Sequence, residues 1–582
     1  MKQYEFEFKN MSFLQKDLTK IKLWCQSNIV SNIVFHIFTE ILDNEKITSI
    51  SNTILTEFPK AHLIGCTTNG NVYNGNFTQR DVIICTIFEY ATTKVDVLQF
   101  DLTNETEKDV TNQLSNYIKN NPWVKSIEFL TTIRNMSMTP LCNDLSKLPK
   151  HIHIFGGGAF SENLNNNSAL VFSSKHSSTD HSIAFLLIGG DDFYVSTSFI
   201  AGWKPLGREL LVTKANGSEL NELDDKPAYN TYYRYLKIQN DEYFFKNTLE
   251  FPFFYNHNGI NILRAPIAST ENGTLIMTSD IEENVKARIA YGDPWTILES
   301  IKQEAQTYAN FAPEAIAIFS CAARRTFWGD SEVYKELLPF QQIASTYGFY
   351  TSSEFQRTNN EVIQHNVTLA VAAMREGEIV DNNIPKIEPK TNIQGGASMI
   401  NRLANFIQAS TEELEDALNQ VKQMAILDGM TGLLNRKEIQ QRITHDIKHN
   451  TESHISLIMM DIDNFKQVND KYGHAEGDNV LIALANMIKA NIAEHAPNYK
   501  AGRWGGEEFM ILCPDTTLEE AVWVAERIRE DFAKLEFELV DHCTMSLGVV
   551  EAAINENPDT TCMRVDNALY QSKANGKNKV TF

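Results

Sequence analysis

The stretch AGRWGGEEFMIL, residues 501–512, places two glycines and two adjacent glutamates between strand-like segments. Gly505 and Gly506 fit a tight hairpin turn, where glycine accepts positive φ without steric cost. Glu507 and Glu508 then begin an apolar strand, although neighbouring carboxylates repel each other. A solvent-facing turn could carry such a pair, but a bound divalent cation would give both carboxylates a role.

A second acidic group favours the cation. ISLIMMDIDNFK, residues 455–466, predicts a buried strand that ends in Asp461, Ile462 and Asp463. Carboxylates at a strand end beside a hairpin could share Mg²⁺, which takes one or two protein carboxylates and completes its shell with substrate phosphates. Metal ions held in this way assist in-line displacement at phosphorus. The two segments therefore predict nucleotidyl transfer.

Further residues suit a nucleotide. Lys466 follows Asp463 by three residues, and Lys573 and Lys577 lie in ALYQSKANGKNKV near the last residue. Each lysine alone is typical of a solvated surface charge, so only the combination is informative. Asn469 and Asp478 could bind the guanine edge, because a carboxylate accepts hydrogen bonds from the N1–H and the exocyclic amine of guanine.

These segments together resemble the GGDEF domain, the catalytic module of diguanylate cyclases. GGEEF is a common active variant of its signature, and DGMTGLLNR resembles the family's opening motif, with Met430 in place of leucine. DIDNFKQVNDKYGHAEGD and TMSLGVV also follow the family pattern, and Lys577 stands where arginine is common. The resemblance implies a palm-like α/β domain that condenses two GTP into cyclic di-GMP and releases two pyrophosphates.

The resemblance also implies roles for single residues. In the family, two domains meet face to face, each holding one GTP, so a monomer is expected to be inactive. Mg²⁺ or Mn²⁺ would be bound by Asp461, the carbonyl of Ile462 and Glu507, while Glu508 would help to place the metal or the triphosphate. Either glutamate, or a bound water, could act as the base. The substrate contacts implied are Lys466, Asn469, His474, Asp478, Lys573 and Lys577.

One family feature is missing from the sequence. Many cyclases carry an R-x-x-D inhibitory site five residues before the signature, where this chain reads Ala496-Pro497-Asn498-Tyr499. We therefore expect no inhibitory site, and no tight product inhibition through one.

Composition limits the kinds of partner and the cellular compartment that we expect for the protein. The formal net charge of −22 disfavours nucleic-acid and anionic membrane partners. The eight cysteines show no CxxC spacing, and neither a signal core at the first residues nor an apolar run of membrane-spanning length is found. We expect a reduced, cytoplasmic protein.

The chain divides near residue 380. DNNIPKIEPKTNIQGGAS, residues 381–398, reads as a linker. Apolar residues then recur every seven positions over 400–427, which predicts either a helix that pairs with a second copy of the chain or one that lies on its own domain. The predicted seam comprises Ile400, Leu403, Ile407, Ser410, Leu414, Ala417, Val421 and Met424. We predict domains at 1–224, 225–378, 379–427 (linker and helix) and 428–582.

The first 375 residues mix strand and helix signals, with strands expected at 31–38, 81–88, 182–190 and 315–322, and no internal repeat is visible. The overall fold class is α/β and α+β, in several domains. Five segments resemble a FIST sensory domain, in N-terminal and C-terminal halves: HLIGCTTNGNV (62–72), HIHIFGGGAFSEN (151–163), the longer 199–228, AIFSCAARRTFWG (317–329) and YGFYTSSEF (347–355). Glycines after these strands could form ligand-binding nests or ordinary turns.

The FIST family implies a small-molecule ligand, which the sequence does not identify; haem is one option, though no histidine can be chosen to bind it. Arg324 and Arg325 could clamp a carboxylate ligand or form internal ion pairs. Cys66 and Cys321 read as small core residues. The order of sensor, helix and cyclase predicts a ligand-regulated diguanylate cyclase, active as a homodimer. The alternative is a silent protein that binds GTP or cyclic di-GMP.

Overall fold

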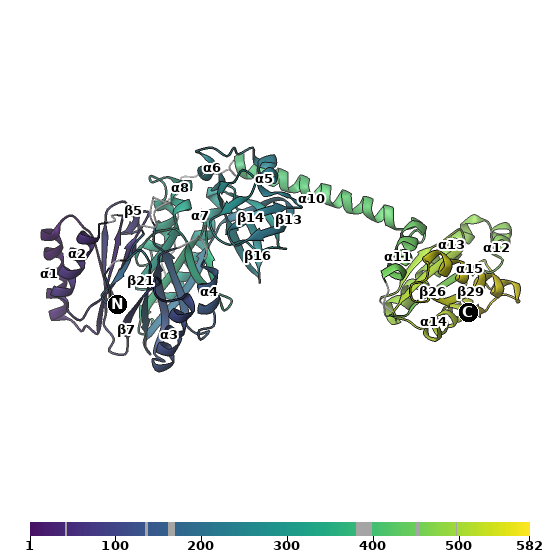
Figure 1. Ribbon diagram of the computed structural model, residues 1–582, viewed down its shortest axis with the longest axis horizontal. Helices are drawn as coiled ribbons and strands as arrows, with labels where there is room; N and C mark the ends of the chain where they lie inside the picture. Colours follow the sequence, from purple (N-terminus) through teal and green to yellow (C-terminus); the bar gives the residue numbers. More distant parts are fainter. Residues whose placement is uncertain are drawn as a thin grey trace. The chain divides into compact units, whose positions relative to one another are not determined.

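The computed structural model describes residues 1–40, 43–133, 138–160, 169–177, 179–379, 399–449, 453–495 and 498–582. The chain forms two compact units, Met1–Thr411 and Glu412–Phe582 (Figure 1). The expected α/β, multidomain class is confirmed, since each unit packs helices against β-sheets. Among helices of the described ranges, none has both the length and the apolar composition that crossing a bilayer requires.

The described part of unit 1 contains one strand pattern three times. In each sheet an edge strand pairs antiparallel with a second strand, the second pairs antiparallel with a third, and the third pairs parallel with a fourth. The first sheet has the order β1 (Lys2–Glu7), β6 (Val82–Phe88), β2 (Asn32–Thr39), β3 (His62–Thr67). The second has β7 (Lys94–Asp101), β11 (Ser182–Gly189), β8 (Val124–Thr131), β9 (His153–Gly158). The third has β12 (Phe193–Ile200), β25 (Leu369–Glu376), β21 (Ala315–Cys321), β22 (Ser345–Thr351).

The three repeats exchange strands in a cycle. The segment after the fourth strand of each repeat pairs antiparallel with the fourth strand of another repeat. The exchanged strands are β4 (Asn71–Tyr73), which pairs with β22, β10 (Val171–Ser173), which pairs with β3, and β23 (Glu354–Thr358), which pairs with β9. The expectation of no internal repeat was therefore wrong: the repeats share topology and burial pattern rather than residue identity.

The glycine-based segments of the sequence are the three equivalent fourth strands. Each carries a glycine directly opposite a residue of the parallel third strand. A Cβ on that glycine would lie no more than 2.4 Å from the carbonyl oxygen of the opposite residue. The pairs are Gly65 with Ile37, Gly156 with Phe129 and Gly348 with Ile318. These glycines permit close strand approach inside a sheet, which replaces both the nest and the turn interpretation at these positions.

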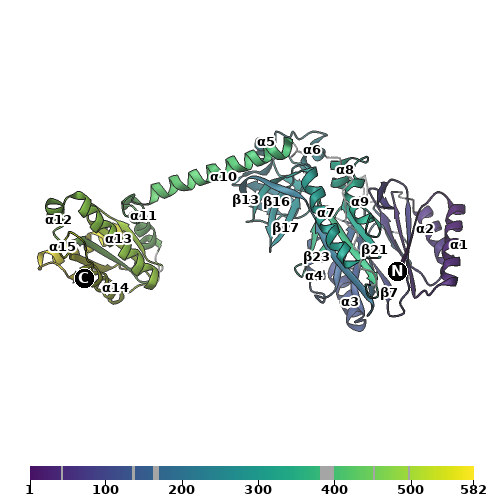
Figure 2. The same ribbon diagram turned by 180° about the vertical axis from the view of Figure 1, so that it is seen from behind.

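Helices cover the sheets where their apolar residues recur at helical spacing. α1 (Met11–Ser27) starts at the N-cap Asn10, and its Leu14, Leu18 and Ile21 pack with α2 (Asn44–Glu57) on the first sheet. Both views show these two helices together on one side of that sheet (Figures 1 and 2). The remaining helices of the repeats are α3 (Glu107–Asn120), α4 (Thr139–Leu145), α7 (Pro294–Phe311), α8 (Ala322–Trp328) and α9 (Tyr334–Gln341).

An insertion of mostly β-structure lies between β12 and β21, with its own apolar core. Its strands are β13 (Trp203–Asn216), β14 (Glu219–Leu223), β15 (Lys226–Pro227), β16 (Phe253–His257), β17 (Ile260–Arg264), β18 (Pro266–Ser269), β19 (Leu275–Met277) and β20 (Lys286–Gly292), and its helices are α5 (Ala228–Leu236) and α6 (Phe244–Thr248). The short strands β5 (Asn76–Thr78) and β24 (Glu361–His365) complete the sheets of unit 1. All four strands that the sequence predicted in this unit are confirmed as β2, β6, β11 and β21.

The helix predicted at 400–427 is α10 (Met399–Ile426). Its described apolar side chains include residues of the predicted seam that face solvent: Leu403, Ile407, Leu414 and Val421. Phe406 and Leu418, which flank that seam, are exposed as well. The linker 380–398, and the side chains of Ile400 and Met424, lie outside the described residues.

Unit 2 is one sheet with helices on both faces. Its strand order is β27 (Lys500–Arg503), β28 (Glu508–Pro514), β26 (Ile455–Ile462), β29 (Met545–Glu551) and β30 (Val580–Thr581), which confirms the strands predicted around the signature. Alternate residues of β26 point to opposite faces: Met460 packs with α13 (His474–His495) and α14 (Leu518–Ala533), and Met459 packs with α11 (Arg436–His449) and α15 (Pro558–Ala574). α12 (Phe465–Tyr472) follows β26 directly.

Candidate nucleotide and metal site

The two acidic segments meet where β26 ends and β28 begins, because these neighbouring strands pair antiparallel with Asp461 opposite Glu508. Asp461 is only 5% exposed, while Glu507 and Glu508 are half-buried. Burial, with the nearby charges of Glu507 and Glu508, raises the pKa of Asp461 to about 6. Carboxylates gathered in this way favour a cation between them.

One cation of the protein already lies there. Lys573, in the last turn of α15, places its Nζ 2.7 Å from Oδ2 of Asp461. This ion pair lowers the pKa of Asp461 and so offsets part of the effect of burial. Lys573 is therefore within reach of the carboxylate predicted to bind metal, at the position where phosphate oxygens are also expected.

The structure separates Asp461 from Asp463. The Asp463 carboxylate accepts hydrogen bonds from the hydroxyls of Thr544 (2.8 Å) and Ser546 (2.6 Å) and from the backbone N–H of Asn578 (3.0 Å). A carboxylate that is buried and bonded in this way holds β29 and the last turn of the chain to β26. Of the two aspartates, Asp461 is therefore the candidate metal ligand. Its carboxylate lies beside the two glutamates of the signature and, among the described residues, is paired only with the ammonium group of a lysine side chain.

The signature turn differs from its prediction in one respect. Gly505 and Gly506 do connect β27 to β28, and the backbone N–H groups of Trp504 and Gly505 donate to the carbonyl of Glu508 at 2.8 and 3.2 Å. Neither glycine has positive φ, so the expected conformational reason was wrong. A Cβ on Gly505 would lie 2.4 Å from Oε2 of Glu508, so this glycine makes room for a carboxylate.

Arg503 is a residue beside the site that the sequence reasoning missed. Its guanidinium donates to the carbonyl of Gly505 at 3.2 Å and to that of Gly506 at 3.0 and 2.6 Å. It also pairs with Asp428 at 3.4 Å, and Asp428 accepts from the N–H and the hydroxyl of Thr431. The arginine thus fixes the glycine turn to the segment DGMTGLLNR. A cation two residues before two glycines was the available signal.

The remaining base-side residues gather where α12 meets α13. Gly473, with φ of +88°, makes the corner, and Asn469 lies so close to Gly477 that a Cβ there would be 2.0 Å from Oδ1 of Asn469. Asp478 is the next residue and is half-buried, whereas His474 and Lys466 are exposed. Asn469 and Asp478 are therefore neighbours, as the guanine prediction requires.

Lys577 lies on the same side of the domain. Its residue has positive φ, and its Nζ donates to Oδ1 of Asn464, the N-cap residue of α12. This contact places Lys577 at the beginning of the helix that carries Lys466. The phosphate contacts of all three lysines stay predictions.

The donor set fits Mg²⁺ or Mn²⁺. Asp461 and Glu507 are hard oxygen ligands, and the carbonyl of Ile462 follows directly on the strand. The described residues contain no group of three or more His, Cys, Asp or Glu side chains arranged to hold a metal. Two carboxylates suffice, however, when triphosphate oxygens and water complete the shell.

Comparison with known families agrees with this geometry. Residues 425–579 match the family model described as diguanylate cyclase, GGDEF domain. The C-terminal region is a GGDEF domain. Residues 34–226 match the FIST N domain and residues 228–357 match the FIST C domain. The chain thus joins two FIST domains to a GGDEF domain, as the sequence motifs indicated; the finer domain limits stay predictions.

Curated relatives share the GGDEF region. The diguanylate cyclase DgcM of Escherichia coli K12 is 39% identical over 167 residues, which are 28% of this chain and 39% of DgcM. The diguanylate cyclase VdcA of Vibrio cholerae is 30% identical over 200 residues, 33% of this chain and 58% of VdcA. The chain therefore spans less than two thirds of the length of either relative.

A solved structure matches the same region. It is the coiled coil and GGDEF domain of DgcB from Caulobacter crescentus in complex with c-di-GMP, 33% identical in sequence. The match covers 31% of this chain and 96% of that chain, with a TM-score of 0.29.

The suggested ligand groups of the FIST region have internal partners. Arg324 is fully buried and pairs with Glu336, and Arg325 binds Asp330 and the carbonyl of Asn69. Internal ion pairs therefore account for both arginines. Cys66 and Cys321 are buried, and burial raises the pKa of both thiols, in agreement with core roles.

The haem option gains no support from His36 and His365, the two histidines that are fully buried among the side chains that the structure describes. His36 contacts the Glu128 carboxylate at 3.3 Å, and His365 stacks on Phe199.

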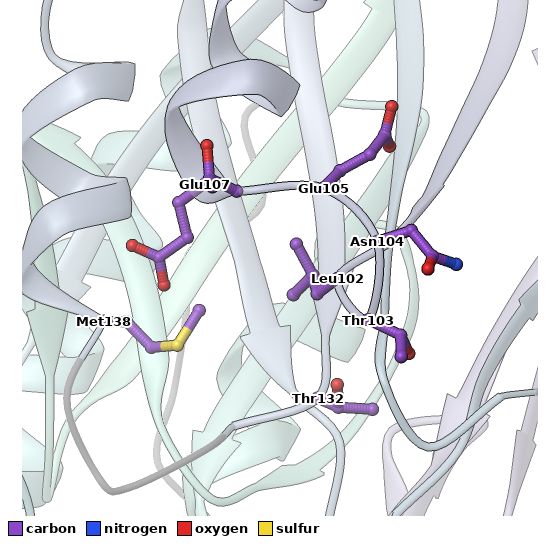
Figure 3. A pocket seen from close by; sticks show the side chains of 8 residues that line it. Leu102, Thr103, Asn104, Glu105, Glu107, Thr132 and Met138 are labelled. Atoms are coloured by element: carbon purple, nitrogen blue, oxygen red, sulfur yellow. The ribbon is translucent and has the colours of Figure 1, made fainter.

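A cavity of about 390 Å³ in this region is lined by loop 102–107, Thr132 and Met138. Its polar side chains diverge: Glu107 points toward Met138 and Glu105 points away (Figure 3). This cavity lacks the converging polar groups that ligand sites use.

Proposed function

We propose that this chain is a diguanylate cyclase that condenses two GTP into cyclic di-GMP and two pyrophosphates. The observation that carries the proposal is the arrangement of charged side chains where β26 ends and β28 begins. There Asp461 faces Glu508, Glu507 adjoins them, and Lys573 lies on Asp461. The family match and the relatives named as diguanylate cyclases support the same reaction.

The roles of the residues follow from their chemistry. Asp461, Glu507 and the carbonyl of Ile462 would hold Mg²⁺ or Mn²⁺, which supplies charge neutralisation at the triphosphate. Glu508, in contact with the glycine turn, positions that site. Glu507 or Glu508 can take the proton of the attacking 3′-hydroxyl, and the described contacts leave this choice open. The proposed substrate contacts are Lys466, Asn469, His474, Asp478, Lys573 and Lys577.

Lys573 couples substrate binding to the carboxylates. In the protein alone its ammonium neutralises Asp461, a buried acid whose pKa is raised. When triphosphate binds, the Lys573 ammonium can turn to the phosphate oxygens, and the Asp461 carboxylate that it releases would then hold Mg²⁺ or Mn²⁺. The site thereby keeps its charges balanced both with and without nucleotide.

Each GGDEF domain has one such site, so the reaction needs two domains, and we propose a homodimer. The exposed seam of α10 is suited to pairing with a second copy, since Leu403, Ile407, Leu414 and Val421 would be removed from water. The helix end is fixed to the catalytic domain: the Asn435 side chain donates to the carbonyl of Ala425, and its N–H donates to that of Ile426. A change of pairing in α10 would therefore reach the signature turn through Asp428 and Arg503.

We further propose that a small ligand of the FIST domains regulates this pairing. The order of domains along the chain supports it, as does the position of β25, whose last residue, Glu376, precedes α10 in the chain.

The test is chromatographic separation of the products formed from GTP and Mg²⁺ by the full chain. The comparison is a Glu507→Gln, Glu508→Gln double variant, with Glu519→Gln, an exposed acid of the same domain, as matched control. Cyclic di-GMP from the wild type and the control, and none from the double variant, is expected. Binding of GTP without product in all three would instead favour a silent receptor.

A further inference from the structure

A second cavity of unit 1, of about 450 Å³, lies between two of its sheets. One wall is β12 of the third sheet and the other is formed by β9 and β23 of the second. We name it the His153 pocket, defined by Lys150, His153, Thr197, Phe199, Gln356 and Arg357. A volume of this size is typical of small-molecule sites.

Polar side chains converge on this pocket from both sheets. Nδ1 of His153 lies 3.0 Å from the hydroxyl of Thr197, which bridges β9 to β12. Gln356 is two positions along from Glu354 on β23, and its register partner on β9 is Phe155, so Gln356 and His153 share the inner face of the sheet. These groups come from distant parts of the sequence and meet only in the fold.

Gln356 has an unused hydrogen-bond acceptor. The side chain is 1% exposed, and its Oε1 has no hydrogen-bond partner among the described residues. A buried polar group without a partner is destabilising and needs an explanation, and in a pocket lining a ligand can supply the missing hydrogen bond. Gln356 therefore calls for a hydrogen-bond donor inside the pocket.

Buried residues behind the pocket lining, which do not themselves line it, repeat this pattern. Phe199 stacks on His365 with ring centroids 4.1 Å apart, and neither ring nitrogen of the buried His365 has a partner within the described ranges. Glu354, opposite His365 in the β23–β24 register, is also buried, and its Oε1 has none there either. Unpaired polar atoms therefore lie behind Phe199 as well as at Gln356 in the pocket lining.

The charge of the lining favours an anion. Lys150 and Arg357 are cationic, and the lining contains no carboxylate. The Arg357 guanidinium donates to the carbonyls of Pro149 and Ile152, which fixes the loop that carries Lys150. Burial, together with the charge of Arg357, lowers the pKa of His153, so this imidazole stays neutral and adds no positive charge.

We propose that the His153 pocket binds a small hydroxycarboxylate, with its carboxylate toward Lys150 and its hydroxyl donating to Oε1 of Gln356. A hydroxyl is preferred over an ammonium, because an ammonium would meet two cations and no lining carboxylate. The binding site does not rest on the proposed cyclase activity; if that activity holds, the site gives the chemical class of the regulatory ligand.

One wall of the pocket, β12, pairs with β25, a strand that precedes α10 in the chain. β12 pairs with β25 in a register that sets Thr197 opposite Ala372 and Phe199 opposite Ala370. β25 ends at Glu376, and it is the last strand before α10 among the residues that the structure describes. A ligand that draws β12 toward β9 would therefore act on the strand that precedes the signalling helix.

The test is isothermal titration calorimetry of the full chain with two matched sets of probes: L-lactate, propionate and L-alanine, and L-malate, succinate and L-aspartate. The members of a set differ mainly in the group at one carbon. We expect saturable binding of a hydroxy acid, about tenfold weaker binding of its deoxy analogue for the loss of one hydrogen bond, and weaker binding still of the amino acid.

Two variants complete the test. Gln356→Met removes the acceptor at similar volume and should abolish the preference for the hydroxy acid, whereas Gln303→Met, at an exposed position of α7, should leave it unchanged. The proposal is overturned if neither hydroxy acid binds the wild type, if the amino acids bind equally well, or if Gln356→Met keeps the preference. None of these readouts uses GTP, so a failure here is distinct from a failure of the cyclase proposal.

Discussion

Replacing Arg503 by alanine tests whether the signature turn is held from outside. The side chain is 14% exposed, donates to the carbonyls of Gly505 and Gly506 and pairs with Asp428. At about 1 kcal/mol for each net hydrogen bond, and less than that for the ion pair, the ordered turn loses about 2–3 kcal/mol. Because Glu507 and Glu508 follow the turn directly, this loss falls on the geometry of the carboxylates.

The expected result is a fall in kcat/KM for GTP of about 30- to 150-fold, with the fold intact by circular dichroism. Arg503→Lys keeps the charge but not the forked donors, and should lie between wild type and alanine. The matched control is Arg442→Ala, which breaks a half-buried pair with Glu438 one helical turn away and should change kcat/KM less than about twofold. Wild-type activity of Arg503→Ala would refute the reasoning that the arginine orders the turn.

Four further outcomes follow. Asp463→Ala should lower the free energy of unfolding of unit 2 by about 3–5 kcal/mol in urea, because three hydrogen-bond donors lose their acceptor. Asp461→Asn should abolish activity without a comparable loss of stability. Equal stability of the two variants would contradict the structural role of Asp463 and the metal-binding role of Asp461. Leu414→Glu, at a 62% exposed position of α10, should yield monomers in light scattering and a corresponding loss of cyclase activity; an active dimer would exclude the seam. Burial lowers the pKa of His365 to about 3, so below pH 6.5 this histidine is protonated in the unfolded chain but not in the folded chain. The free energy of unfolding should therefore fall by about 1.4 kcal/mol for each pH unit below 6.5. Urea titrations at pH 5 and 7 should show this slope for the wild type and not for His365→Phe. Cyclic di-GMP should not inhibit noncompetitively with respect to GTP, since residues 496–499 read APNY; tight inhibition of that type in a kinetic assay would disprove this.

The GGDEF domain was predictable because its charged site residues lie close together in short sequence motifs. Asp461, Glu507 and their apolar strands lie within short segments, where alternation and turn residues determine register. Arg503 escaped notice because its partners are carbonyl groups and Asp428, 75 residues away. The role of Gly505 was misjudged for a different reason: the prediction assigned it a backbone conformation, whereas the space it leaves is filled by the side chain of Glu508, three residues along the same turn.

The FIST region shows the opposite case. Its strands could be located from apolar runs, but the threefold arrangement could not, because β4, β10 and β23 leave their own repeats to pair elsewhere. Gly65, Gly156 and Gly348 marked the equivalent strands, yet their common function depends on carbonyl groups of strands that are distant in sequence. The His153 pocket was likewise invisible, since Gln356 and Thr197 meet only across two sheets.

The most direct test of the central claim is the stoichiometry of GTP turnover by the full chain with Mg²⁺, measured as pyrophosphate released per cyclic nucleotide formed. The account predicts two pyrophosphates for each cyclic di-GMP, with a rate that rises with the square of protein concentration where dimers are scarce. One pyrophosphate per cyclic mononucleotide, or GTP binding with no pyrophosphate at all, would contradict it.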